Sequence, residues 1–153
     1  MGNQRKLMIE QLDKKLLSFK NAGEINIPTK GWINGIRNTL NMTLDQFGKN
    51  LGITRQGARR IELSEASGTI SVNLLKEAGK AMHMRFVYGF VPVYGSLEAL
   101  IDQKANELAK RIVLRTNQTM MLEDQATGKE DIERAITELA GEFKKEMARS
   151  LWD

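Results

Sequence analysis

The sequence has few of the residues from which metal and redox sites are built. Its 153 residues include no cysteine and a single histidine. Disulfide frameworks, thiolate zinc sites, cysteine nucleophiles and iron–sulfur clusters all need ligands that this chain lacks. No pair of candidate acid and base residues stands in a recognisable catalytic context. We therefore expect a protein that is not an enzyme and that holds neither a metal nor a cofactor.

Long apolar runs are also missing. No stretch approaches the roughly 20 apolar residues that a bilayer span needs, and the N-terminus lacks the apolar core of a signal peptide. The composition, 41% hydrophobic and 27% charged, is that of an ordinary globular protein. We expect a cytoplasmic protein without a membrane segment, and the absence of cysteine fits that compartment.

Charge is distributed unevenly along the chain. The net charge is +4, but residues 1–95 carry 14 basic and 7 acidic side chains, whereas residues 96–153 carry 9 and 12. The basic N-terminal part suggests contact with a polyanion, and the mildly acidic C-terminal part suggests contact with another protein or a second copy of the chain. On charge alone, an ordinary solvated lysine-rich surface explains the excess equally well.

Helical spacing of apolar residues dominates the sequence, and only two prolines interrupt it. The pattern predicts a mostly α fold in four parts. Residues 1–28 form an amphipathic helix and a linker, and residues 29–83 form a module of short helices. Residues 84–95 contain one short strand, and residues 96–153 form a helical hairpin.

Side-chain caps divide the central module into helices. Thr43 and Gln46 have the spacing of a capping box, Gly52 is suited to end that helix, and Thr54 and Ser71 are suited to begin the next two. In the hairpin, Ser96 and Thr127 are the corresponding predicted caps.

The segment MRFVYGFVP, residues 84–92, is β-branched and aromatic and alternates large side chains, which predicts a strand. A lone strand leaves its backbone groups unpaired, and no partner strand is evident elsewhere in the sequence. The same strand of a second copy across a twofold axis is the expected partner. The segment therefore predicts a homodimer.

Residues 43–62 carry the clearest functional signal. A capped helix, a glycine turn and a second capped helix rich in arginine match helix-turn-helix geometry, in which the second helix enters the DNA major groove. Arginine can fork onto guanine O6 and N7, and glutamine onto adenine N6 and N7. A solvated helix face is the alternative. The residues of this segment that are expected to contact double-stranded DNA include Lys49, Thr54, Arg55, Gln56, Arg59 and Arg60.

Trp32–Met82, which includes TLDQFGKNLGITRQGARRIELSEASGTI, resembles the XRE-type helix-turn-helix of phage repressors. The resemblance implies that Arg37 and Glu62 form a buried structural pair and do not contact DNA. Gly48 and Gly57 depart from the family, which often has alanine at the first position and a side chain at the second.

The same resemblance implies roles at the DNA surface. Arg55 and Gln56 match the two groove-facing positions at the start of the recognition helix, and Arg60 matches a third position one turn later. Thr43 matches a helix cap that touches phosphate. A palindromic operator bound by a homodimer is then expected.

A wider resemblance extends from residue 29 to the C-terminus. The segments PTKGWINGIRNTLNMTLDQFGKNLGITRQ, EASGTI, FVYGFVP, TMMLEDQ and LWD are similar to the family called mobile mystery protein A. The resemblance implies a helix-turn-helix protein encoded beside a Fic-domain partner in an arrangement like that of a toxin and its antitoxin. The implied function is an autorepressor that also serves as an antitoxin.

Antitoxins of Fic enzymes use a helical Ser/Thr-x-x-x-Glu element, and the chain has one match, from Thr119 to Glu123. The resemblance implies that these two residues inhibit the partner, although Asp124 stands where the pattern has glycine or asparagine. About one such match is expected by chance. The alternative is that Met120 and Met121 are core residues and that Glu123 is a solvated charge.

Three function classes follow from the sequence. They are a sequence-specific DNA-binding repressor, an antitoxin that also binds DNA, and a partner-binding inhibitory or scaffold protein without specific DNA readout. The first two are compatible.

Overall fold

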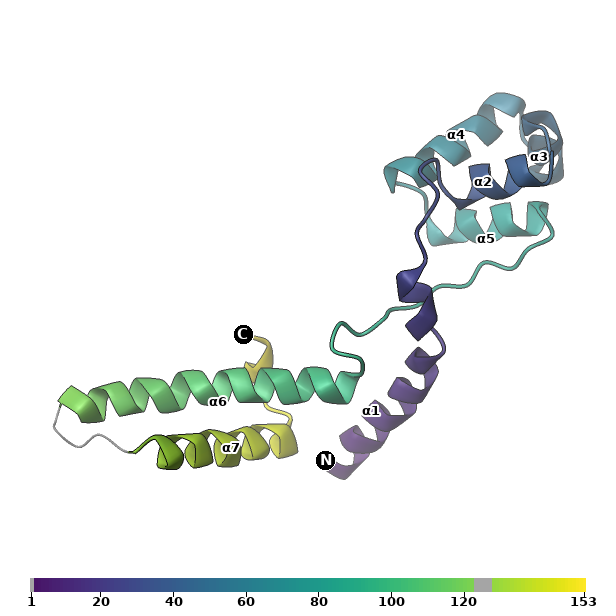
Figure 1. Cartoon of the computed structure of the whole chain (residues 1–153). Helices are drawn as coiled ribbons and strands as arrows, with labels where there is room; N and C mark the ends of the chain where they lie inside the picture. The colour runs from purple at the N-terminus through teal and green to yellow at the C-terminus, as the bar shows by residue number, and fades with distance from the viewer. Residues whose placement is uncertain (1, 123–127) are drawn as a thin grey trace. The chain divides into compact units, whose positions relative to one another are not determined.

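The structure is a computed structural model that describes residues 2–122 and 128–153. The described chain is mostly helical, as predicted (Figure 1). Its helices are α1 (Gly2–Leu17), α2 (Trp32–Thr39), α3 (Leu44–Leu51), α4 (Arg55–Ser67), α5 (Val72–Ala81), α6 (Leu97–Leu122) and α7 (Lys129–Glu146), with short 3-10 segments η1 (Lys20–Glu24) and η2 (Arg149–Trp152).

The chain folds as two units. One unit is Glu24–Tyr88 and holds α2 to α5. The other combines the chain up to Gly23 with the chain from Gly89 onward, and it holds α1, α6 and α7. The N-terminal helix therefore shares a unit with the C-terminal helices, although more than sixty residues separate them in the sequence.

The core of Glu24–Tyr88 is built around Phe47, which is completely buried. Small residues such as Ala58 and Ala78 are also fully buried beside it, which lets the helices approach closely. Burying an aromatic side chain of this size contributes about 1.5–3 kcal/mol. The remaining buried members of this core are Ile33, Ile61, Ala81 and Met82.

The predicted caps of this unit are confirmed. The Gln46 N–H donates to Thr43 Oγ1 at 3.1 Å, and the Thr43 N–H donates to Gln46 Oε1 at 2.9 Å, which completes the capping box. Gly52 ends α3 in the left-handed conformation. Thr54 and Ser71 cap α4 and α5 through their hydroxyl oxygens. Three of the four short helices, α3, α4 and α5, therefore begin at caps that their own sequence supplies.

In the other unit, α6 and α7 lie side by side (Figure 1). Ile101, Ala105 and Ala109 recur every fourth residue on α6 and are buried, together with Ala140 and Leu151. The Ser96 hydroxyl accepts the Ala99 N–H at 3.0 Å, which confirms the predicted cap of α6. The N-cap of α7 is Gly128, one residue after the predicted cap Thr127, which lies outside the described residues.

Helix α1 is joined to α6 by a side-chain cap that the sequence did not reveal. The Asp13 carboxylate accepts the Leu97 N–H at 2.7 Å and the Glu98 N–H at 3.3 Å. Ile9, one turn earlier on the same face, packs against the core of α6 and α7. Four other apolar side chains of α1 stay exposed, namely Leu7, Met8, Leu12 and Leu17.

The predicted strand within residues 84–95 is not formed in the single chain. The Met84 N–H donates to the Gly79 carbonyl at 2.7 Å, which folds the chain back over the end of α5. From Arg85 to Val91 the chain is irregular, and within the described residues it has no strand to pair with. A strand requires a hydrogen-bonded neighbour, so its alternating pattern alone does not produce one.

Among the described residues, no helix combines the length and the apolar character needed to cross a bilayer. This finding covers α1 to α7 as far as they are described.

Lys144 of α7 forms ion pairs with α6, at 2.6 Å to Asp102 Oδ1 and 3.8 Å to Glu98 Oε1. The hydrogen bond that Lys144 donates to Asp102, opposed by desolvation, raises the pKa of Lys144 above its ordinary value of 10.5. A raised pKa in the folded state means that the stabilisation is fully present below pH 10.5 and is lost as the pH rises through the folded pKa.

We therefore expect Lys144→Met to lower the melting temperature at about pH 8 and to have a smaller effect at about pH 11, where loss of the Lys144 proton begins to remove the stabilisation. The effect at the lower pH is modest because the Lys144 side chain is 42% exposed. The exposed Lys145 provides a matched control, since Lys145→Met removes the same charge from a side chain that forms no ion pair with the described residues. Thermal melts that give Lys144→Met the same deficit at both pH values would contradict this account.

Candidate nucleic-acid interface

The candidate interface is formed by α3, α4 and the turn between them. The Ile53 N–H donates to the Gly48 carbonyl at 2.9 Å, and Gly52 adopts a φ of 73°. A Cβ atom on Gly48 would lie 3.0 Å from the carbonyl oxygens of both Ile53 and Thr54. The missing side chain at Gly48 therefore lets α3 approach the turn closely, which gives a packing reason for glycine at this position.

Helix α4 separates its buried and exposed residues cleanly. Ala58, Ile61 and Glu62 face the core and are buried. At the helical repeat of 100° per residue, the exposed residues 55, 56, 59, 60 and 63 occupy one continuous arc of about 140°. The structure thus brings the predicted contact residues Arg55, Gln56, Arg59 and Arg60 together on the solvent face of one helix.

The two threonines that were predicted to contact DNA, Thr43 and Thr54, cap their helices with the same geometry. Thr43 Oγ1 accepts the Gln46 N–H, and Thr54 Oγ1 accepts the Gly57 N–H, each at 3.1 Å. Both residues are exposed, and each hydroxyl retains its own hydrogen to donate. Each threonine therefore holds a helix start and can still donate to an anion beside it. The remaining predicted residue, Lys49, is exposed on the last turn of α3.

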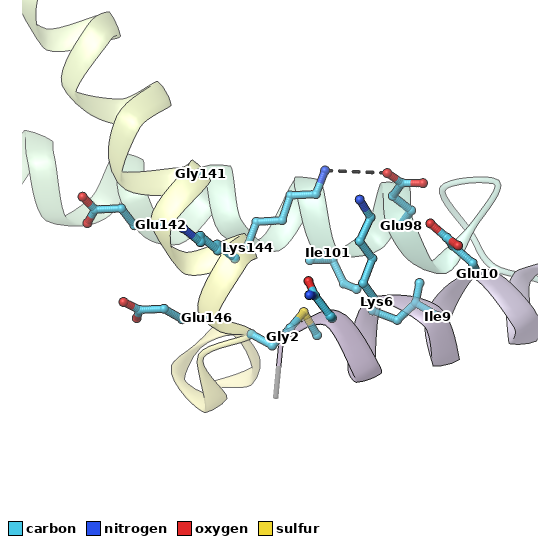
Figure 2. Close-up of a pocket in the computed structure, with 13 residues that line it drawn as sticks. Gly2, Lys6, Ile9, Glu10, Glu98, Ile101, Gly141, Glu142, Lys144 and Glu146 are labelled. Carbon is cyan, nitrogen blue, oxygen red and sulfur yellow. Dashed lines mark ion pairs between the residues drawn. The ribbon is translucent and has the colours of Figure 1, made fainter.

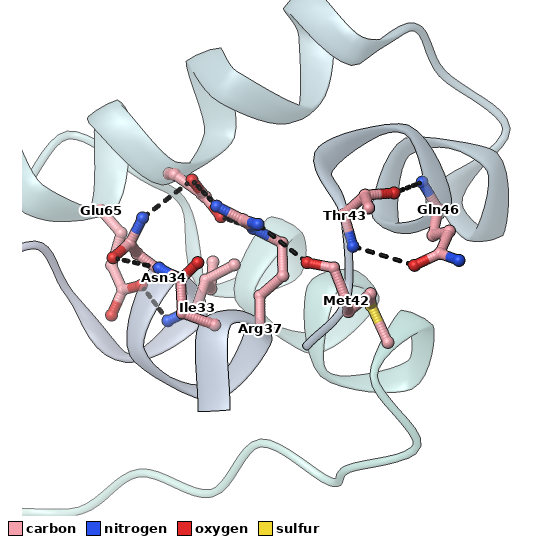
Figure 3. A network of polar contacts seen from close by, with 9 residues as sticks. Ile33, Asn34, Arg37, Met42, Thr43, Gln46 and Glu65 are labelled. Atoms are coloured by element: carbon pink, nitrogen blue, oxygen red, sulfur yellow. Dashed lines mark hydrogen bonds and ion pairs between the residues drawn. The ribbon is translucent and has the colours of Figure 1, made fainter. Parts of the chain in front are cut away.

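Arg37 and Glu62 form a buried ion pair that links α2 to α4 (Figure 3). Arg37 Nε donates to Glu62 Oε1, and Arg37 Nη2 donates to Glu62 Oε2 at 3.3 Å. Arg37 Nη1 donates to the Met42 carbonyl at 2.8 Å, and Asn34 Nδ2 donates to Glu62 Oε2 at 3.2 Å. Both charges are satisfied inside the domain, so neither is available to a ligand.

Sequence reasoning missed Glu65, which caps α2 from α4. Its two carboxylate oxygens accept the N–H groups of Trp32 and Ile33, each at 2.8 Å (Figure 3). Gly31 makes room for this contact, because a Cβ there would lie 2.8 Å from the Glu65 carboxyl carbon, and its φ is 90°. In the sequence, Glu65 is the first residue of the short segment EASGTI. Nothing in that segment indicates a hydrogen-bond partner more than thirty residues earlier.

A second missed contact lies on the exposed surface itself. Arg55 Nη1 is 3.8 Å from Asp45 Oδ2, and both side chains are largely exposed. Asp45 is the second residue of α3 and Arg55 is the first residue of α4. An acidic side chain therefore stands beside the first predicted base-reading residue.

Of the two residues predicted to inhibit a partner, Thr119 lies within the described chain and Glu123 does not. Thr119 is exposed near the end of α6, and its hydroxyl donates to the Arg115 carbonyl at 3.2 Å. Glu123 lies outside the described residues, as does the rest of the segment up to residue 127. The geometry of the predicted inhibitory element is therefore not part of the described structure.

The other unit has a groove of about 1000 Å³ between α1, α6 and α7 (Figure 2). Ile9, Ile101 and Met147 contribute apolar surface to it. Its charged lining mixes both signs, and includes Lys6, Lys145, Glu10, Glu142 and Glu146. Within the described side chains, no buried nitrogen or oxygen atom lacks a hydrogen-bond partner.

No group of three or more potential metal-ligating side chains gathers within the part of the chain that the structure describes. Comparison of the chain with protein-family models, with curated proteins and with solved structures found no match.

Glu62→Gln is expected to destabilise the protein by about 3 kcal/mol, because it leaves the Arg37 guanidinium buried without its carboxylate. Chemical denaturation measures this loss. Glu77 on α5 provides the control, since it makes an exposed ion pair with Lys80 at 3.8 Å. Glu77→Gln should change stability by less than about 0.5 kcal/mol, and equal effects of the two variants would refute the structural role of the buried pair.

Proposed function

We propose that this protein is a sequence-specific, double-stranded DNA-binding transcriptional regulator with an XRE-type helix-turn-helix, in which α4 is the recognition helix. The observation that carries this proposal is the exposed arc of α4. Three arginines and one glutamine occupy it, while the opposite face of the helix is fixed to the core and to Arg37. Surface arginines on an unsupported helix would lack this rigid backing.

The side chains of the arc match the chemistry of base edges. Arginine offers paired donors to guanine O6 and N7, and glutamine offers a donor and an acceptor to adenine. Arg55 and Gln56 occupy the first two positions of α4, and residues at the start of a recognition helix reach furthest into the groove. Arg59 and Arg60 follow one turn later and extend the same surface.

Phosphate contacts come from the rim of this surface. Thr43 and Thr54 mark the N-termini of α3 and α4, where unpaired N–H groups and the helix dipole favour an anion. Lys49 adds a positive charge on α3. Such contacts position the protein on the duplex without reading its sequence.

The resemblance to mobile mystery protein A supports a more specific version of this proposal. In that version the protein represses its own operon and acts as the antitoxin of a Fic-domain partner. The exposed apolar side chains of α1, including Leu7, Leu12 and Leu17, favour a further protein contact, in agreement with a partner-binding role. The same observation supports the alternative of a scaffold without specific DNA readout.

We further propose that the protein binds a palindromic operator as a homodimer in which residues 84–92 pair with their copy. Within the described chain, the backbone N–H groups from Arg85 to Val91 have no hydrogen-bond acceptor. Phe90 is 82% exposed and Val93 is 93% exposed, which is unusual for large apolar side chains in a stable monomer. Pairing with a second copy along one edge gives an acceptor to every other N–H group of the segment.

Arg55→Ala should weaken binding to a selected operator by about 1–3 kcal/mol and relax the preference at one base pair. Arg134 on α7 is a matched control, because it has the same 67% side-chain exposure and a comparable acidic neighbour. Fluorescence anisotropy with a set of single-base-pair operator variants measures both effects. An unchanged ranking of these operator variants would remove Arg55 from the reading surface.

The homodimer proposal makes a separate prediction. Light scattering should give the mass of a dimer at micromolar concentration, and the two half-sites of the operator should lie about 34 Å apart, one helical turn. Val91→Pro removes a backbone donor from the pairing segment and should shift the protein toward the monomer. A wild-type monomer at this concentration would exclude the palindromic mode of binding.

A further inference from the structure

We infer that Asp45 is a positioning residue that orients Arg55 for guanine and limits sequence-independent binding. This inference rests on the proposed DNA-binding function and deepens it. It starts from the ion pair across the turn between α3 and α4, in which Arg55 Nη1 lies 3.8 Å from Asp45 Oδ2.

Fold stability does not account for this pair. The two side chains are 67% and 69% exposed, respectively, and exposed ion pairs contribute little to folding because solvent screens them. Asp45 does not take part in the capping box of its helix, which uses Thr43 and Gln46. The Asp45 carboxylate in the first turn interacts favourably with the helix dipole. An acidic side chain at any other position in that turn would do the same.

Attraction to DNA does not account for Asp45 either. It lies on the surface that bears Thr43, Arg55 and the exposed arc of α4. A carboxylate near a phosphate backbone weakens binding to every duplex, whatever its sequence. Its presence beside Arg55 therefore lowers non-specific affinity.

The geometry favours a role in orienting the guanidinium. A free arginine side chain populates many rotamers, and a neighbouring carboxylate reduces that freedom before DNA arrives. The guanidinium has five N–H donors in a planar fork. When one edge faces Asp45, the other edge remains for the paired acceptors of guanine O6 and N7. The carboxylate therefore disfavours use of Arg55 as a simple phosphate contact and favours its use in base readout.

The test uses the full chain and a duplex that the wild-type protein selects from a random library. Affinity is measured for this duplex, for each single-base-pair variant of it and for a scrambled duplex. The proteins are the wild type, Asp45→Asn, Arg55→Ala and the double variant. Glu77→Gln is the charge-matched control, because it also removes one exposed carboxylate from an ion pair of 3.8 Å. Melting temperatures confirm that each variant is folded.

Asp45→Asn should bind the scrambled duplex about threefold or more tightly, as expected when one repelling charge is removed. At the base pair where Arg55→Ala relaxes specificity, Asp45→Asn should also reduce the ratio of affinities for the selected and the variant duplex by about threefold or more. In the Arg55→Ala background, Asp45→Asn should not change that ratio further. Glu77→Gln should leave that discrimination unchanged.

Two results would overturn the inference while leaving the proposed function intact. One is a wild-type sequence preference that Asp45→Asn does not alter. The other is a loss of discrimination by Asp45→Asn that persists in the Arg55→Ala background, since that would make Asp45 a direct base contact. A wild-type protein that selects no sequence contradicts the proposed function and this inference together.

Discussion

The helical module depends on one buried ion pair, between Arg37 of α2 and Glu62 of α4. Removing two charges from water is costly, and the cost is recovered only when both are fully hydrogen-bonded. Asn34 and the Met42 carbonyl supply the remaining partners. The pair therefore tolerates few arrangements of α2 and α4, and it fixes which face of α4 turns inward.

Glu65 strengthens the same connection one turn later. Its carboxylate closes the N-terminus of α2, and Gly31 leaves the space for it. Two acidic residues of α4 thus bind groups of α2, and the outer arc of α4 carries no acidic side chain between Arg55 and Arg60. The positive charge of this surface follows from how the helix is anchored, which links the packing of the module to its proposed contact with DNA.

Local signals in the sequence predicted local structure well. Thr43, Gln46, Gly52, Thr54 and Ser71 act within four residues of their own positions, so their spacing alone located the ends of three helices. The acidic caps were not predictable in this way, because Asp13 caps a helix 84 residues later and Glu65 caps one 33 residues earlier. The association of α1 with α6 and α7 was missed for the same reason.

The prediction of a strand at residues 84–92, unlike that of the helix caps, depends on a partner segment outside the strand itself. Alternation of large side chains over 84–92 describes how residues would lie on a sheet, but a sheet also requires a second strand. The described single chain offers none. Of the candidate site, the sequence indicated the arginines of α4 and both threonine caps, whereas Asp45 became apparent only when the turn placed it beside Arg55.

The most direct test of this account is an anisotropy titration of the full-length protein on the duplex upstream of its own gene and on a scrambled duplex, at two salt concentrations. Contacts to phosphate alone give binding that depends steeply on salt and ignores sequence. We expect a preference for the native duplex of about a hundredfold or more that persists at the higher salt. Equal, weak and strongly salt-dependent binding to both duplexes would contradict it.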